Sequence, residues 1–197
     1  MEARSIPIGR PQGRGGDPQI SRWRESRLIR AARRGDERAL ETLFDAHWTR
    51  SHRTAYLVCR DAAAAEDIAQ EAFLAAIRRL DRFDYRRPFA PWLHRIVVNR
   101  AIDHARAAKL RGRPTDPIEL NATVADAGDG ARTEISEELL TGIGALEPER
   151  RALIALRYLL ELTPGEIAEM LEIPRGTVNS RLRRALDELA TALEGSR

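Results

Sequence analysis

Five polar side chains lie on one side of a predicted helix near the C-terminus, and their chemistry is that of DNA recognition. They are Arg175, Asn179, Ser180, Arg183 and Arg184. Arginine can donate two parallel hydrogen bonds to guanine, asparagine can pair in the same way with adenine, and both side chains also bind phosphates. Residues 174–186 contain four arginines and no acidic residue. The alternative is a surface helix whose arginine face is simply solvated.

The elements that would position these residues favour DNA binding. Thr163, Pro164 and Glu166 form the sequence of a capping box with proline at the first helical position, so a short helix should begin there. Pro174 ends that helix and can begin the next. The second helix has one apolar stripe with helical spacing, made by Val178, Leu182, Ala185, Leu186 and Leu189. Residues 162–189 therefore predict a helix-turn-helix, whose second helix enters the major groove.

A second group of candidate residues lies between 81 and 91, where two prolines interrupt the helical pattern. Phe83, Tyr85 and Phe89 alternate there with three arginines. Aromatic rings stack on unpaired bases while arginine holds the backbone, so this composition fits single-stranded nucleic acid. The alternative, that the aromatic rings of the loop fill the core, is equally compatible with it. The helix predicted from 92 to about 110 begins at Trp92 and presents a polar stripe beside the loop, with Arg95 and Asn99 at its start.

A third group lies on the helix predicted from 61 to about 80, where Asp67, Gln70 and Glu71 share an outer face. A solvated face is the ordinary interpretation, and docking on a basic partner is the alternative. An enzyme acting on nucleic acid is disfavoured, because no histidine, lysine or second carboxylate cluster joins the two acids. No phosphate-cradling glycine loop is present either, and we expect no cofactor.

Composition and charge set the organisation of the 197 residues. Scarce β-branched runs predict an all-α fold. We expect a disordered tail at 1–24, a helical domain at 25–110, a flexible linker at 111–132 and a helix-turn-helix four-helix unit at 133–197. Residues 137–197 contain eight arginines and eleven acidic residues, a net charge of −3. Because the whole chain has a net charge of +3, the first 136 residues have a net charge of +6. The tail is a solvated extension or a phosphate contact.

Several classes of protein are disfavoured. Cys59 is the only cysteine, so no internal disulfide can form, which suits the cytoplasm. The four histidines show no metal-ligand spacing. No 18-residue apolar run predicts a membrane span, and the N-terminus lacks the apolar region of a signal peptide.

Two runs in this order resemble conserved regions of the extracytoplasmic-function sigma factors. AEDIAQEAFLAAIRRLDRF…WLHRIVVNRAIDHARA (65–107) resembles their second region, and LEPERRALIALRYLLELTPGEIAEMLEIPRGTVNSRLRRALDEL (146–189) resembles their fourth. The resemblance implies a non-enzymatic bacterial protein that binds core RNA polymerase at the β′ clamp helices and the β flap and directs it to promoters. It also implies two helical domains on a linker, and an anti-sigma factor as a further partner.

The resemblance assigns roles to the three groups. Asp67, Gln70 and Glu71 match the segment that docks on the β′ clamp helices, which overturns the solvated-face interpretation. Trp92, Arg95 and Asn99 match the motif beside the loop that captures a flipped base of the −10 element. Asn179, Ser180, Arg183 and Arg184 match the recognition-helix positions that read the −35 element. Asn179 stands where many members carry lysine or arginine, so the promoter sequence cannot be inherited from them. The competing interpretation is a stand-alone helix-turn-helix regulator, usually a dimer, which would leave the other two groups without a role.

Overall fold

The computed structural model describes residues 21–112 and 136–194, and within these ranges all regular structure is helical. The predicted all-α class is therefore confirmed. Most of the predicted tail (1–20), most of the predicted linker (113–132) and the last three residues lie outside the described ranges.

Local capping sequences determine where the first helices begin. These helices are α1 (Arg22–Ala32), α2 (Glu37–Cys59), α3 (Ala62–Arg79), a 3-10 turn η1 (Leu80–Arg82) and α4 (Phe89–Leu110). The side chains of Ser21, Asp36 and Asp61 each accept the backbone N–H three residues ahead and so cap α1, α2 and α3. The tail was expected to extend to residue 24. Because Ser21 caps α1 and α1 begins at Arg22, the expected tail was too long.

The second group of helices is assembled around the helix-turn-helix. It contains α5 (Glu137–Ala145), α6 (Pro148–Ile154), a π-helical turn η2 (Ala155–Leu159), α7 (Pro164–Leu171) and α8 (Arg175–Glu194). The predicted stripe of α8 faces inward, with Val178, Leu182, Ala185 and Leu189 buried. The predicted four-helix unit with its helix-turn-helix is thus present.

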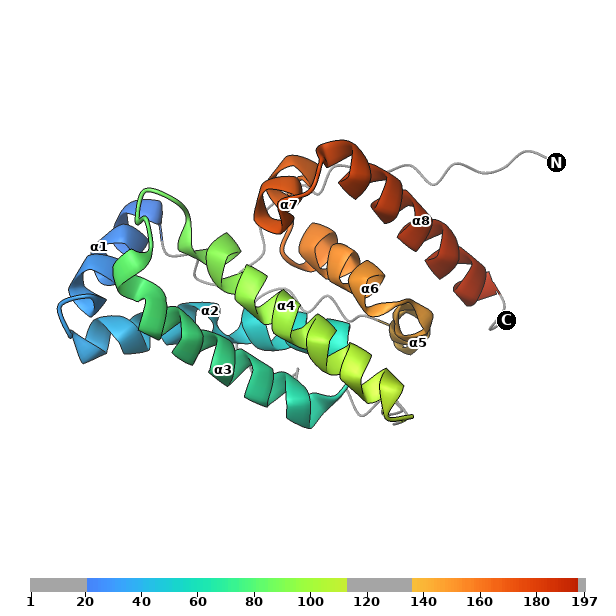
Figure 1. The fold of residues 1–197 in the computed structure, drawn as a ribbon, viewed down its shortest axis with the longest axis horizontal. Helices are drawn as coiled ribbons and strands as arrows, with labels where there is room; N and C mark the ends of the chain where they lie inside the picture. The colour runs from blue at the N-terminus through green and yellow to red at the C-terminus, as the bar shows by residue number, and fades with distance from the viewer. Residues whose placement is uncertain (1–20, 113–135, 195–197) are drawn as a thin grey trace.

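The two groups pack against each other, which no local pattern in the sequence indicated. One apolar cluster runs from α2, α3 and α4 into α5, α6, α7 and α8. In Figure 1, α4 lies alongside α6, and both α2 and α4 contact the second group of helices. Two ion pairs join α4 to the start of α6, Arg106 with Glu149 and Lys109 with Glu147. In the described residues, α4 therefore packs against α2 and α3 of its own group and against α6 and α7 of the second group.

A second, smaller apolar cluster fills the far end of the first group. It joins Ile29 and Ala32 of α1 to the loop phenylalanines Phe83 and Phe89 and to Leu93 of α4. Ile77 of α3 is 42% exposed, because α3 packs on the other helices through its neighbouring alanines and Phe73. This cluster supports the loop between η1 and α4.

Candidate nucleic-acid interface

Helix α7, the first helix of the helix-turn-helix, begins with the capping box that its sequence predicted. The Thr163 N–H donates to the Glu166 carboxylate at 2.8 Å, and the Glu166 N–H donates back to the Thr163 hydroxyl at 3.3 Å, which is a complete capping box. At the C-terminal end of α7, Glu172 adopts a left-handed conformation with φ of 55°. A Cβ placed on Gly176 would meet no atom within 4 Å, so close packing against α7 does not explain this glycine.

The predicted DNA-reading residues share the outer face of α8. Arg175, Asn179, Ser180, Arg183 and Arg184 are all exposed, on the side of the helix opposite the buried stripe. The Ser180 hydroxyl donates to the Thr177 carbonyl at 3.1 Å and retains its capacity to accept. Arg181 is also exposed but lines a cavity between the two groups of helices. This face offers exposed guanidinium and amide groups, which is what base-edge contacts need.

The aromatic loop is only partly available to a ligand, and this corrects the prediction. Phe83 and Phe89 are 6% and 3% exposed and pack edge-on at a ring-centroid distance of 5.7 Å, so neither ring can stack on a base in this arrangement. For these two residues the alternative, that the loop aromatics fill the core, is correct. Tyr85 is 42% exposed, and Trp92 is half-buried with its ring 4.7 Å from that of Phe83. Tyr85 and Trp92 remain the aromatic candidates.

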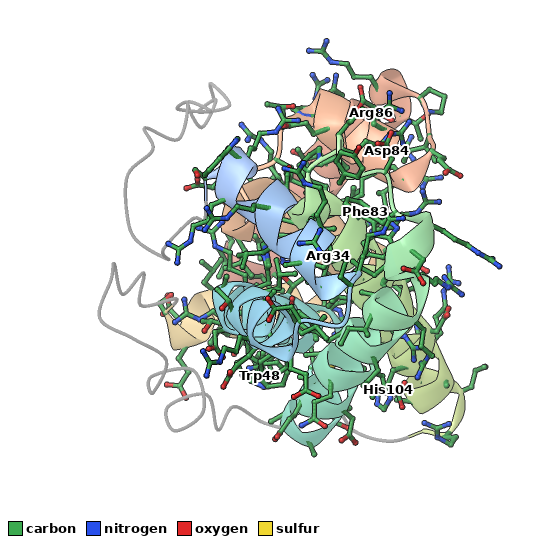
Figure 2. The ribbon with its side chains drawn as sticks, turned by 90° about the vertical axis from the view of Figure 1, so that its left-hand side faces the viewer. Arg34, Trp48, Phe83, Asp84, Arg86 and His104 are labelled. Atoms are coloured by element: carbon green, nitrogen blue, oxygen red, sulfur yellow. The ribbon has the colours of Figure 1, made fainter. Side chains whose placement is uncertain are left out.

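The tip of the loop has its own polar structure. Arg86 donates to the Asp84 carboxylate from its backbone N–H at 3.1 Å and from Nε at 3.0 Å. These bonds lower the pKa of Asp84 and raise that of Arg86. Figure 2 shows Asp84 and Arg86 together at the upper end of the view, with Phe83 below them toward the interior. The loop is therefore held by its phenylalanines and presents Tyr85 and arginines outward.

The two candidate polar residues of α4, Arg95 and Asn99, differ in their availability to a ligand. Asn99 is exposed, whereas Arg95 is half-buried and donates to the Glu172 carboxylate, beyond α7, at 2.7 Å. The bond raises the pKa of Arg95 and lowers that of Glu172. Asn99 is thus free to meet a ligand, while Arg95 is engaged by the other group of helices.

The acidic face of α3 is exposed as predicted. Asp67, Gln70 and Glu71 are all exposed, and Leu74 beside them is 52% exposed. Gln70 donates to Glu66 at 3.2 Å, and Glu71 forms an ion pair with Arg100 of α4. An exposed acidic face with an apolar neighbour is suited to a basic partner surface that also offers an apolar contact.

The seam between the two groups contains features that the sequence did not reveal. A cavity of about 190 Å³ is lined mainly by apolar side chains of both groups, with Glu149 and Arg181 as its charged members. Also at the seam, Arg60 and Arg151 are 4% and 5% exposed, and the Nε and Nη1 atoms of both have no hydrogen-bond partner in the structure described. Burial, together with the charge of Arg60, lowers the pKa of Arg151. Burial also raises the pKa of the Cys59 thiol to about 11.

The prediction also missed a buried acid that reaches the loop. Glu25 of α1 is 7% exposed, accepts the Phe89 N–H at 3.2 Å and lies 3.1 Å from Nε2 of His47. The available signal was its position: Glu25 is four residues before Ile29 and seven before Ala32, on the buried side of α1.

Metal and membrane features are not found in the part of the chain that the structure describes. No three histidine, cysteine or carboxylate side chains in residues 21–112 and 136–194 gather as metal ligands. None of the helices in these ranges combines the length and apolar character that crossing a bilayer requires.

Comparison with known families decides what this arrangement belongs to. Residues 43–111 match the model of Sigma-70 region 2, and residues 136–189 match that of Sigma-70 region 4. The ECF RNA polymerase sigma factor SigM of Mycobacterium tuberculosis (strain ATCC 25618 / H37Rv) is 36% identical over 169 residues, covering 86% of this chain and 84% of that protein. The chain belongs to the extracytoplasmic-function (ECF) sigma factors. This sigma factor therefore directs RNA polymerase in promoter-specific transcription and, like its family, acts as an initiation factor that binds core polymerase and promoter DNA.

Other relatives agree along most of the sigma factor's length. SigW of Bacillus subtilis (strain 168) is 32% identical, covering 84% of this chain and 94% of that protein. Among solved structures, CnrH in complex with the cytosolic domain of CnrY has a TM-score of 0.66 at 26% identity, covering 88% and 99% of the two chains. The sigma factor RpoE in complex with the anti-sigma factor NepR from Bartonella quintana has a TM-score of 0.59 at 19% identity, which supports the fold. The stand-alone regulator is not favoured by these findings.

Proposed function

We propose that this sigma factor divides promoter recognition between two surfaces and docks on core polymerase through a third. The outer face of α8 reads the −35 element, with Asn179, Ser180, Arg183 and Arg184 directed to base edges and Arg175 at the start of the helix. The observation that carries this proposal is the separation of α8 into a buried apolar stripe and an exposed face of arginine and asparagine.

The −10 element meets the loop and the first turns of α4. Tyr85 and Trp92 offer aromatic surface, and exposed Asn99 offers both a donor and an acceptor to an unpaired base. Phe83 and Phe89 support this surface from beneath, since both rings are buried. Arg95 can contact DNA only after its ion pair with Glu172 breaks, so we expect the two groups of helices to separate when the holoenzyme forms.

Docking on core polymerase uses the acidic face of α3. Asp67, Gln70 and Glu71 meet the β′ clamp helices, and the second group of helices meets the β flap. Support comes from the exposure of all three side chains and of Leu74 beside them. The sigma factor acts where core polymerase meets DNA, in the cytoplasm.

An anti-sigma factor is the further partner that we propose. Two relatives with similar folds were solved in complexes, one with the cytosolic domain of CnrY and one with the anti-sigma factor NepR. The anti-sigma factor would cover surfaces of the sigma factor that core polymerase binds, so the two proteins would compete for the same sites.

The docking proposal is tested by reversing one charge. Asp67→Lys should abolish binding to core polymerase and promoter-specific run-off transcription, because it opposes the positive partner surface at an exposed position. Asp67 is a cleaner target than Glu71, whose reversal would also break the ion pair with Arg100. Glu41→Lys, at an exposed position of α2, is the matched control. Normal core binding by Asp67→Lys, or equal loss in both variants, would remove the acidic face from the docking site.

A further inference from the structure

Helix α1 holds the loop that precedes α4 at several points. The Arg22 guanidinium donates to the Arg86 carbonyl at 3.3 Å, and the Ser26 hydroxyl donates to the Tyr85 carbonyl at 3.2 Å. The Arg30 guanidinium lies 5.7 Å from the centroid of the Tyr85 ring. Residues 22, 26 and 30 are one helical turn apart, so they form a single stripe facing the loop. In Figure 1 the blue α1 lies beside this loop. These contacts are exposed, and each is individually weak.

One contact from α1 is buried and has a specific task. The first N–H groups of a helix need acceptors, which a side chain at the N-cap usually supplies. The N-cap of α4 is Pro88, which makes no side-chain hydrogen bond to the helix. Instead, Oε2 of Glu25, 64 residues earlier in the chain, accepts the Phe89 N–H at 3.2 Å. Its negative charge at the start of α4 is also favoured by the helix dipole.

The environment of Glu25 fits capping better than packing. The side chain is about nine-tenths buried, and its second oxygen lies 3.1 Å from Nε2 of His47 on α2. Burying a carboxylate is costly unless hydrogen bonds and charges compensate for it, so an apolar side chain would fill this space at less cost. The carboxylate instead joins three helices at one point: α1 carries it, α2 faces it through His47, and α4 begins on it.

We propose that Glu25 is a positioning residue for promoter opening. By capping α4 from α1, it fixes the direction in which the loop and the first turns of α4 present Tyr85, Trp92 and Asn99 to the separated strand. Glu25 lies before residue 43, where the region 2 match begins, so the role is carried by contacts outside that match. This inference rests on the proposed role of the loop and α4 at the −10 element.

The test compares three variants in reconstituted holoenzyme at a temperature where all remain folded by circular dichroism. Glu25→Leu leaves the buried Phe89 N–H without an acceptor, and we expect about tenfold faster exchange of that amide and about tenfold slower open-complex formation. Glu25→Gln keeps an oxygen for Phe89 and should behave nearly as wild type. Val58→Ala removes buried methyl groups from α2 without touching the loop, and should lower stability while leaving both readouts unchanged.

Each outcome decides one point. Rescue by glutamine together with loss in the leucine variant supports positioning by a hydrogen bond. If Glu25→Leu and Val58→Ala slow opening equally, the effect is ordinary destabilisation and the proposal is overturned. It is also overturned if the Phe89 amide exchanges faster while opening stays normal. Asn99→Ala in the same assay distinguishes failure of the Glu25 proposal from failure of the proposed role of α4. If the Asn99→Ala holoenzyme opens promoters normally, the role of α4 at the −10 element is refuted, whatever the Glu25 variants show.

Discussion

Acid should destabilise this protein through one buried imidazole, that of His94 on α4. His94 is 3% exposed, and burial lowers its pKa from 6.5 to about 3. The nearby imidazole of His47 and the guanidinium of Arg50 act in the same direction, whereas a hydrogen bond to the Ala90 carbonyl acts against them. The unfolded chain therefore binds a proton at His94 below pH 6.5 while the folded chain does not, so stability is lost as pH falls from about 6.5 toward 3.

The magnitude follows from the difference between the two pKa values. One pKa unit corresponds to about 1.4 kcal/mol, so the full loss approaches about 5 kcal/mol at pH 3. Between pH 7 and pH 5, linkage to this group alone removes about 2 kcal/mol of the free energy of unfolding. A small helical protein has on the order of 5–15 kcal/mol in total, so the loss should be easily measured.

The assay is urea unfolding followed by circular dichroism at pH 7, 6 and 5. His94→Met keeps an apolar side chain of similar size but cannot take up a proton, so its stability should change much less over this range than that of the wild type. His52→Met is the control, because the pKa of half-buried His52 is also lowered by burial and should contribute a smaller share of the slope. Identical pH dependence in wild type and His94→Met would refute the assignment of a neutral, buried His94.

Two further predictions concern the helix-turn-helix and the seam. Arg183→Ala should weaken recognition of the −35 element by about 1–3 kcal/mol if the guanidinium contacts guanine through two hydrogen bonds, whereas equal loss on scrambled DNA would reduce it to a phosphate contact. Arg151→Met should raise the urea midpoint by the equivalent of about 1 kcal/mol or more, because it removes a buried charge close to that of Arg60. The Nε and Nη1 atoms of Arg151 have no hydrogen-bond partner in the described structure, so the substitution breaks no hydrogen bond at these atoms. A lower midpoint would show that Arg151 is compensated within the seam.

The helices could be predicted because their signals are local. The capping box at Thr163, the proline at 164 and the spacing of the apolar residues in α8 all lie within a few residues of the structure that they determine. The candidate face of α8 followed directly, because residues three and four apart share a side of a helix.

Other features depend on contacts between distant segments and could not be predicted in the same way. Composition showed that the loop is aromatic, but the burial of Phe83 and Phe89 depends on α1, which lies more than 50 residues earlier. Glu25 stands among arginines in the sequence, and its hydrogen-bond partner is the N–H of Phe89, 64 residues later. The Arg95–Glu172 ion pair forms because the two groups of helices pack against each other. No periodic pattern in the sequence indicates that packing.

The central claim is that this sigma factor opens promoters through α4 once it is bound to core polymerase, and permanganate footprinting tests it most directly. Holoenzyme with the wild-type protein should make thymines near the −10 element reactive, while the free protein should bind the same DNA only weakly, because its two recognition surfaces are not held at promoter spacing. Asn99→Ala should lose that reactivity while retaining −35 binding. A normal bubble in the Asn99→Ala holoenzyme, or tight promoter binding by a dimer of the free protein, would contradict the account.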